Sequence, residues 1–244
     1  MERMPHIGLP SDLGIEYAIL PGDPARVDKI ASYLDNVEDL GFNREYKSVC
    51  GTYKGVKVLA MSTGMGGTST AIGVEELARI GVKVAIRVGS CGAMQPEIHL
   101  GDLILVNGAV RQDGTSKGYA PVEYPAIPDF ELLKACIESA KELDVDYVVG
   151  INRSHDCLYG EENQGATEIW SPRKVVSSDQ ETSALFVVGM MRGMKTASIL
   201  NVVANHNADI LESVGKYADG ASATQAGERN EILVALEAIC RIYI

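Results

Sequence analysis

Three short segments rich in glycine and hydroxyl residues each follow an apolar run of the sequence. They are residues 21–26, 62–69 and 87–92. Glycine lets a backbone approach a ligand closely, and successive backbone N–H groups can surround an anion. Two of the segments also carry an arginine, Arg26 and Arg87, and a guanidinium group binds phosphate through paired N–H donors. The pattern therefore predicts a site for a small oxyanion such as phosphate.

Each of these signals also has a purely structural interpretation. Residues 21–26 could form only a turn, and residues 62–69 only a loop before a helix capped by Thr68 or Ser69. Arg87 lies at the edge of a predicted buried strand and needs a counter-charge, which could be an internal carboxylate or a bound phosphate. Neither GxxxxGK[ST] nor GxGxxG occurs, which argues against a nucleoside triphosphatase and a Rossmann dehydrogenase.

The elements that must position these residues alternate between apolar runs and amphipathic stretches. Residues 69–79 carry apolar side chains at helical spacing, and Gly81 ends the pattern. We therefore predict an α/β sandwich with a mixed or mostly parallel sheet, whose ligand lies at the carboxyl ends of the strands. The predicted strands are residues 17–20, 56–61, 82–88, 103–106, 147–151 and 196–203, and the predicted helices are residues 69–79, 129–143, 182–191 and 228–243, the last beginning just after Gly227.

Bulk composition limits the classes of protein to consider. The chain has 244 residues, 46% of them hydrophobic, which predicts a single domain over residues 1–244. It has no apolar run long enough to span a membrane, and its charged, proline-containing N-terminus is unlike a signal peptide. The net charge of −11 disfavours binding to nucleic acid or anionic membranes, so a small anion would need a local group of arginines.

The cysteines are scattered, without a CxxC pair or a repeated Cys/His spacing. They are Cys50, Cys91, Cys136, Cys157 and Cys240. We expect free thiols in a reducing cytoplasm, most of them buried, and no Cys/His metal site. Cys91 is the expected exception, because it falls within a predicted glycine-rich turn.

Seven segments, in order along nearly the whole chain, resemble the nucleoside phosphorylase family, which includes uridine phosphorylases and hexameric purine nucleoside phosphorylases. They read PGDPARVDKIA, NREYKS, STGMGGTSTAIGVEELARIG, RVGSCGAMQP, GDLILVNGAVRQDGTS, YAPVEYPAIPDFEL and SDQETSAL. VRQDGTS followed by APVEYPA is most similar to the uridine phosphorylase branch. The resemblance implies a three-layer α/β sandwich with a mixed central sheet. It also implies phosphorolysis of a nucleoside to free base and ribose 1-phosphate or its 2′-deoxy form.

The resemblance further implies a phosphate site shared between two subunits. Within one chain the phosphate ligands would be Gly22, Arg26, Arg87 and Ser90. Arg44 would reach into the phosphate site of a neighbouring subunit, and His6 would reach the ribose 5′-hydroxyl there. A homodimer would then be the smallest active unit, commonly assembled into a homohexamer.

For the sugar, Glu181 matches the family's ribose-binding glutamate and would hold the 2′-hydroxyl. The family motif Glu-Met-Glu reads Asp179-Gln180-Glu181 here, so the methionine that packs against the sugar is replaced. The predicted catalytic residues are Arg87, Glu181 and Asn205. The other residues predicted to contact the nucleoside are His6, Ser90, Cys91, Gly92, Leu158, Glu162, Gln164, Asp179, Gln180 and His206.

The residues that would meet the base depart from both branches of the family. Asn205 stands where the purine branch has an aspartate. The uridine branch also has asparagine there, but an arginine follows it, whereas this chain has His206. Glu162 and Gln164 fall near the two uracil-reading positions of the uridine branch without matching them. Base specificity therefore stays open: a uridine phosphorylase-like activity comes first, and a purine nucleoside phosphorylase of broad or 6-oxopurine specificity is the alternative.

Two other functions stay open at this stage. A hydrolytic nucleosidase would share the fold, but it would leave Arg26, Arg44 and Arg87 without a purpose. A non-catalytic nucleoside-binding protein is favoured only by the altered motif at residues 179–181 and by residues 205–206.

No organic cofactor is implied, because inorganic phosphate is the co-substrate. Some uridine phosphorylases hold a monovalent cation between subunits, and Glu45, the carbonyl group of Met65 and Ser69 match those positions. The resemblance allows such a cation here.

Overall fold

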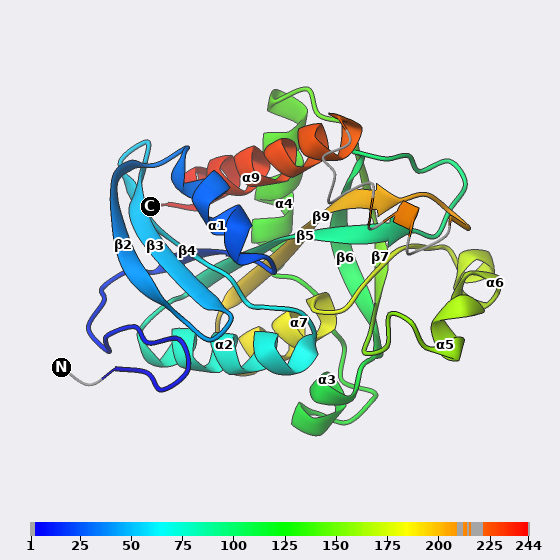
Figure 1. Ribbon diagram of the computed structural model, residues 1–244, viewed down its shortest axis with the longest axis horizontal. Helices are drawn as coiled ribbons and strands as arrows, with labels where there is room; N and C mark the ends of the chain where they lie inside the picture. Colours follow the sequence, from blue (N-terminus) through cyan, green and yellow to red (C-terminus); the bar gives the residue numbers. More distant parts are fainter. Residues whose placement is uncertain (1–2, 209–211, 214, 216–221, 244) are drawn as a thin grey trace.

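In the computed structural model, which describes residues 3–208, 212–213, 215 and 222–243, one mixed sheet lies between two layers of helices (Figure 1). The strands of these residues are β1 (Tyr17–Pro21), β2 (Asp35–Asn43), β3 (Tyr46–Tyr53), β4 (Val56–Met61), β5 (Val84–Ala93), β6 (Leu103–Gln112), β7 (Tyr147–His155), β8 (Val175–Asp179) and β9 (Lys195–Ala204). The helices are α1 (Pro24–Ala31), α2 (Gly67–Arg79), α3 (Gly114–Tyr119), α4 (Phe130–Glu142), α5 (Glu161–Gln164), α6 (Ala166–Trp170), α7 (Thr182–Met191), α9 (Ser222–Ile242) and a short 3₁₀ helix at Ser171–Arg173.

The sheet has the strand order β2-β3-β4-β1-β5-β8-β7-β6-β9, and β5 pairs with β9 as well. Strands β5, β8, β7, β6 and β9 therefore close a ring. β1 is parallel to β4 and β5, whereas β8 is antiparallel to β5 and β6 is antiparallel to β9. The ring brings strands from both halves of the chain side by side, which is how distant segments come to share one site.

Successive side chains of the central strands enter two different cores. Ala18 and Leu20 of β1 lie in the core covered by α2 and α7, whereas Ile19 lies in the core covered by α1, α4 and α9. In β5, Ala85 and Ile86 divide in the same way. This alternation follows from the two-residue period of a strand and explains why both of its faces must be apolar.

The architecture confirms the predicted three-layer α/β sandwich with a mixed sheet, while the single-domain organisation stays a prediction. α7 has the predicted bounds, and all six predicted strands are present, several of them longer than expected. Strands β2, β3 and β8 were missed. β2 escapes a search for apolar runs because nearly all of its side chains are exposed. Within the described residues, no helix has the length and apolar character needed to cross a bilayer.

Two local predictions were wrong. Residues 89–92, predicted as a turn, continue β5 to Ala93, because they pair with the end of β9. Cys91 therefore lies on a strand and is buried, and Cys157 is the exposed cysteine, although all five are free as expected. The last helix does not begin after Gly227 but spans Ser222–Ile242, so that Gly227 lies inside it.

Gly227 is a point of close approach between α9 and β9. A Cβ placed on it would lie 2.1 Å from Asn201 Oδ1 and 2.8 Å from the carbonyl oxygen of Gly101. Asn201 is buried and its Nδ2 donates to the Thr224 carbonyl oxygen at 2.8 Å, so it has little freedom to move. The helix can therefore pack this closely on the strand only with glycine at this position.

Gly227→Ala should lower the free energy of unfolding by about 2 kcal/mol through overpacking, measured by urea denaturation. Gly118→Ala in α3 is the control, because nothing lies within 4 Å of the added methyl group. It should change stability by less than about 0.5 kcal/mol. Equal losses in the two variants would contradict the packing argument.

Candidate active site

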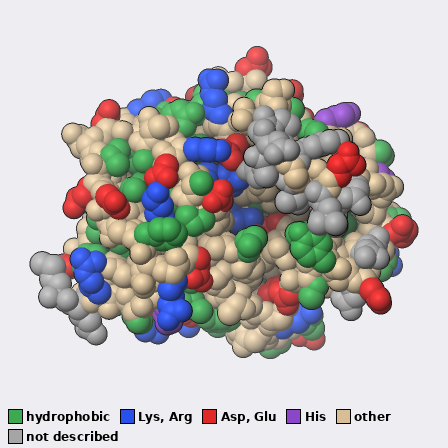
Figure 2. All heavy atoms as spheres, viewed as in Figure 1, with side chains coloured by type: hydrophobic (Ala, Val, Ile, Leu, Met, Phe, Trp, Pro, Cys, Tyr) green, Lys and Arg blue, Asp and Glu red, His purple; other side chains and the backbone are tan. Residues whose placement is uncertain are grey.

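A cavity of about 1080 Å³ opens where β1, β4, β5, β7, β8 and β9 end. Open α/β sheets bind their ligands at this position. Lys and Arg side chains gather near a hollow at the centre of this face (Figure 2). The glycine-rich segments 21–26, 62–69 and 87–92 all contribute to the wall, as the sequence led us to expect.

Arg26 and Ser90, two of the predicted phosphate ligands, contact each other at one end of the cavity. Asp23 caps α1 by accepting the Ala25 N–H at 2.8 Å, which places Arg26 in the first turn of the helix. The buried Arg26 side chain donates from Nη2 to Ser90 Oγ at 3.2 Å and from Nη1 to the Val88 carbonyl oxygen at 3.1 Å. α1 and β5 thus position these two groups together.

Two glutamates of α9 contact Arg26, and Glu228 supplies the counter-charge. Arg26 Nε lies 3.3 Å from Glu228 Oε2, and Nη1 lies 3.2 Å from Glu231 Oε1. Glu228 also pairs with Lys29. Glu231 is completely buried, and this burial raises its pKa to about 8, although Arg26 opposes the shift. Glu231 is therefore mostly protonated at neutral pH.

Arg87 lines the same cavity and pairs with carboxylates on two sides. Its Nε donates to Asp179 Oδ2 at 3.1 Å and its Nη2 to Glu181 Oε2 at 2.6 Å. Burial by itself would lower the pKa of Arg87, but Glu181 and Asp179 raise it above its ordinary value. Internal carboxylates therefore provide the counter-charge that Arg87 needs.

One donor of Arg87 is left over. Its Nη1 is buried and has no hydrogen-bond partner among the described residues. This nitrogen faces Gly22, where a Cβ would lie 3.9 Å from Nη1 and 3.2 Å from the carbonyl oxygen of Gly64. An unpaired cationic N–H beside a bare glycine backbone is what an oxyanion site requires.

Glu181 lies next to this site at the start of α7. Its Oε1 accepts the Gly66 N–H at 2.5 Å, and its Oε2 accepts from Arg87. Burial raises the pKa of Glu181, and the attraction of Arg87 only partly opposes the shift. The carboxylate is thus held between the loop after β4 and the end of β5, facing the cavity.

Asp179 lines the cavity, but its oxygens are already occupied. Asn152 and Ser154 donate to Oδ1 at 2.7 and 2.6 Å, and the Thr182 hydroxyl donates to Oδ2 at 2.6 Å. Its main effect is therefore to orient Arg87. The neighbouring Gln180 also lines the cavity and donates from Nε2 to the Asp156 carbonyl oxygen at 3.1 Å.

The far end of the cavity is lined by residues that sequence analysis missed. They include Met94, His155, Tyr159, Asn163, Thr167 and Ser178, beside the predicted Cys91, Gly92 and Leu158. One feature of the sequence could have indicated them. The strand that begins with apolar residues at 147–151 continues with the polar residues Asn152–His155. The side chains of Glu162 and Gln164 lie outside the described part of the structure, so their predicted contacts stay predictions.

Arg44 and His6 lie outside the cavity of their own chain. Arg44 is exposed at the turn between β2 and β3, with a φ of 56°. His6 Nδ1 lies 2.6 Å from Glu76 Oε1, and its carbonyl oxygen accepts from Asn43 Nδ2 at 2.7 Å. The two residues predicted to reach a neighbouring subunit therefore share one surface, and their roles stay predictions.

Asn205 and His206 follow β9, and they line two different cavities. Asn205 lines the main cavity and also a smaller one of about 250 Å³. His206 lines only the smaller one, together with Pro96, Ile98 and His99. The structure thus brings Asn205, but not His206, to the cavity that holds the other predicted residues.

The three residues matched to a monovalent cation lie near one another at the rim. Ser69 Oγ donates to the Met65 carbonyl oxygen at 3.1 Å. A Cβ on Gly64 would lie 2.8 Å from Glu45 Cγ, so the Glu45 side chain packs against the same loop. The described residues contain no group of three His, Cys, Asp or Glu side chains that could hold a metal ion, and the cation stays a prediction.

Comparison with known proteins identifies the family to which this chain belongs. Residues 16–239 match the sequence model of the phosphorylase superfamily. The chain belongs to the phosphorylase superfamily. It is 40% identical to the uridine phosphorylase of Treponema pallidum (strain Nichols), over 96% of this chain and 92% of the relative. This chain is also 38% identical to a guanosine phosphorylase of Halorubrum lacusprofundi, over 84% of this chain and 85% of the relative.

A solved structure agrees with the sequence matches. The crystal structure of uridine phosphorylase from Vibrio fischeri ES114 matches this phosphorylase superfamily chain with a TM-score of 0.91 and 42% identity, covering 99% of this chain and 98% of the other. The family resemblance seen in the sequence and the nucleoside phosphorylase-like fold are thereby confirmed.

The buried Glu231 predicts a pH dependence of stability. Its pKa is about 8 in the folded protein against an ordinary value of 4.5. Between these pH values the folded state keeps a proton that the unfolded chain has lost, so stability falls as the pH rises through this range. Glu231→Gln cannot ionise, so its melting temperature should fall several degrees less than that of the wild type between pH 6 and pH 9.

Differential scanning calorimetry at several pH values measures this difference. Glu97→Gln, at an exposed carboxylate, is the control and should follow the wild-type curve. If Glu231→Gln and the wild type lose stability in parallel, Glu231 does not hold the proton assigned to it.

Proposed function

We propose that this protein is a nucleoside phosphorylase that uses inorganic phosphate to release the free base and ribose 1-phosphate or its 2′-deoxy form. The observation that carries the proposal is Arg87 Nη1, a buried cationic donor without a partner among the described residues, at a cavity that Gly22, Arg26 and Ser90 also line. A phosphate dianion would satisfy this donor and would match both guanidinium groups. Hydrolysis by water would need no such cationic group.

The arrangement suits the chemistry of the glycosidic bond. As this bond breaks, its electron pair leaves with the base, and positive charge grows on the ribose ring. A phosphate oxygen held beneath C1′ stabilises that charge and then forms the new C–O bond. Arg26 and Arg87 would hold the phosphate in position, so much of the rate gain comes from proximity. Glu181, fixed by Gly66 and Arg87, would orient the sugar through the 2′-hydroxyl.

The proposed active unit is a homodimer, assembled further into a homohexamer. The support is the common surface of His6 and Arg44, which lie outside their own cavity, so that they would contact a bound nucleoside or phosphate only in another subunit. We place the enzyme in the cytoplasm, in recovery of bases from nucleosides, without nucleic-acid or membrane partners. It would need no organic cofactor, and a monovalent cation at Glu45, Met65 and Ser69 is a secondary proposal.

Uridine is the first proposed substrate, because relatives named uridine phosphorylase match nearly the whole chain. A purine nucleoside is the second candidate, and the relative named guanosine phosphorylase supports it. Asn205 at the cavity argues against strong acid catalysis on a purine, since it lacks the acidic proton of the purine branch, and the uridine branch also has asparagine there. Asn205 would instead act as a hydrogen-bond partner of the nucleoside.

The deciding assay measures base release from uridine, thymidine, inosine and adenosine, with and without phosphate. We expect turnover only with phosphate, and Arg87→Ala should lower kcat/KM by about 100-fold because the phosphate loses a preorganised donor. Arg79→Ala, at an exposed arginine of α2, is the matched control and should keep wild-type activity. Turnover without phosphate, or an unchanged Arg87→Ala variant, would refute the proposal.

Glu181→Gln tests the sugar contact. The variant keeps the shape of the side chain but weakens the hydrogen bond from the 2′-hydroxyl, which 2′-deoxynucleosides lack. We expect kcat/KM for uridine to fall about 10-fold more than kcat/KM for 2′-deoxyuridine. Equal losses for both substrates would remove the assigned contact while leaving the Arg87 contact intact.

A further inference from the structure

The residues that line the cavity follow the order of the strands across the sheet, from β1 toward β7. Gly22 and Arg26 follow β1, Arg87 and Ser90 belong to the adjacent β5, and Glu181 follows β8, which is the next strand along. β7 lies beyond β8, and it carries His155 into the cavity wall. If phosphate lies at β1 and β5 and the sugar at Glu181, the end of the cavity at β7 lies on the far side of the sugar from the phosphate, where a base can extend.

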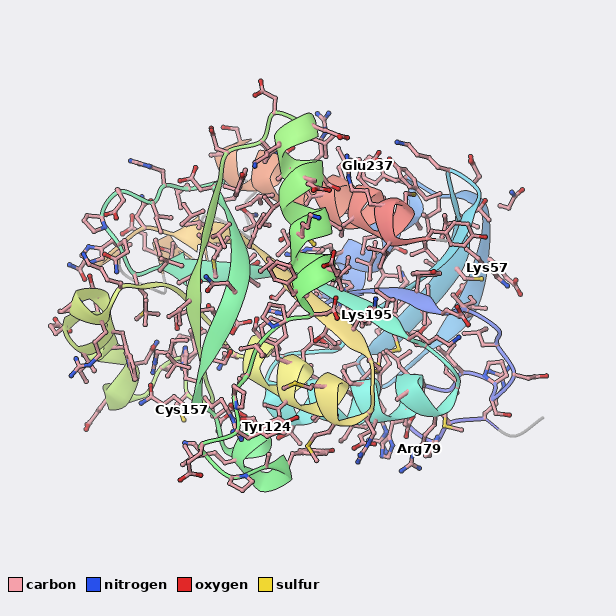
Figure 3. All side chains as sticks on the ribbon, turned by 180° about the vertical axis from the view of Figure 1, so that it is seen from behind. Lys57, Arg79, Tyr124, Cys157, Lys195 and Glu237 are labelled. Carbon is pink, nitrogen blue, oxygen red and sulfur yellow. The ribbon has the colours of Figure 1, made fainter. Side chains whose placement is uncertain are left out.

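His155 is the unassigned polar group at this end. Its side chain lines the cavity, its exposure is 4%, and its Nδ1 is buried without a hydrogen-bond partner among the described residues. Cys157, two residues further on, marks this end of β7, which α5 and α6 flank (Figure 3). A buried polar atom without a partner lowers the stability of the protein. A ligand that forms a hydrogen bond with the imidazole ring of His155 would remove this cost.

Arg153 lies two residues before His155 and therefore on the same face of β7. It is 1% exposed. Its Nε donates to Gln112 Oε1 at 2.6 Å, and its Nη1 donates to Asn163 Oδ1 at 2.8 Å and to Ser178 Oγ at 3.3 Å. Asn163 and Ser178 both line the cavity. Arg153 thus holds two residues of the cavity wall at the β7 end and places a positive charge next to that wall.

We propose that His155 is a specificity-determining residue that hydrogen-bonds the nucleobase, with Arg153 as the positioning residue behind it, and that together they select bases with keto oxygens. This inference rests on the proposed function only for the direction in which the nucleoside lies. Negative charge grows on the leaving base and gathers on its keto oxygens, where a donor and a nearby positive charge stabilise it. Uracil O4 and hypoxanthine O6 are such oxygens, whereas cytosine, which keeps only its O2, and adenine carry an amino group at the corresponding position, so the selection concerns that position.

The surroundings keep His155 neutral. Burial lowers its pKa to about 4, and Arg153 lowers it further, while Asp179 on β8, a backbone hydrogen bond with Cys157 and the charge of Asp156 act in the opposite direction. A neutral imidazole has one donor and one acceptor. It can therefore donate to a keto oxygen without placing a second full charge beside Arg153.

Calorimetric titration of the intact protein tests the base contact. His155→Leu removes the ring nitrogens, and it should weaken uridine binding about 10-fold or more. Its affinity for inorganic phosphate should change less than about 2-fold, because the phosphate residues lie on other strands. His155→Gln keeps a polar group and should recover most of the loss. His99→Leu, at a side chain that is 76% exposed, is the control.

Three results would overturn the inference: unchanged uridine affinity in His155→Leu, equal losses of uridine and phosphate affinity, or a wild type that binds cytidine and adenosine as well as uridine and inosine. The outcome is separable from the proposed function. If uridine binding depends on His155 but no phosphate-dependent cleavage occurs, the proposed function fails and this contact stands.

Titration of histidines labelled with ¹³C at Cε1 tests the part assigned to Arg153. The chain has four histidines, and His155→Gln identifies the resonance of His155. We expect no titration of His155 between pH 5 and 8 in the wild type or in Arg153→Lys, and a raised midpoint in Arg153→Met. If the midpoint is unchanged in folded Arg153→Met, or if wild-type His155 titrates near pH 6.5 like a free imidazole, Arg153 does not have this role.

Discussion

Two buried guanidinium groups, Arg26 and Arg87, are the constraint on which the rest of this site depends. Removing an ion from water costs several kcal/mol even after the protein relaxes. The fold offsets that cost with carboxylates from opposite directions. Glu228 comes from α9, Asp179 is the last residue of β8, and Glu181 lies at the start of α7. This internal neutralisation lets a protein of net charge −11 hold a cationic site before any ligand arrives.

The neutralisation is incomplete at two points: Arg87 lines the cavity, and Glu231 is completely buried. Arg87 keeps one N–H without a partner among the described residues. Glu231 is so deeply buried that it favours its proton over its charge. An anion is therefore attracted to the residual charge, while the carboxylates keep the guanidinium planes in position. Preorganisation of this kind is more effective than a flexible pair of side chains that must be ordered at each turnover.

The sheet arranges the parts of the site in the order in which a nucleoside and phosphate would need them. Because β5 pairs with β1, β9 and β8, the phosphate residues, Glu181 and β7 follow one another across the ring. The departures from the family pattern gather at the β7 end and at residues 179–181, whereas the residues expected at phosphate match. This division has a chemical reason: phosphate is the same in every reaction of this kind, and the base is the part that differs.

The sequence by itself determined the layer architecture and the gathering of residues at the strand ends. Apolar runs such as residues 17–20 and 196–203 have a period that only strands covered on both faces satisfy, and Arg26, Arg87 and Ser90 follow from their place at the ends of those strands. These patterns encode only local properties, such as the period of apolar residues, the residue that caps a helix, or a glycine where two backbones approach closely.

Only the tertiary structure decided which charges meet. Glu231 reads in the sequence as one more polar position of an amphipathic helix, yet it lies 3.2 Å from an arginine 205 positions away in the chain. His155 and Arg153 continue an apolar strand and become a buried polar end of the cavity only because the sheet closes into a ring. Burial and pairing depend on surfaces brought together from distant segments, and no local pattern contains that information. For the same reason the position of His206 outside the main cavity could be read only from the folded chain.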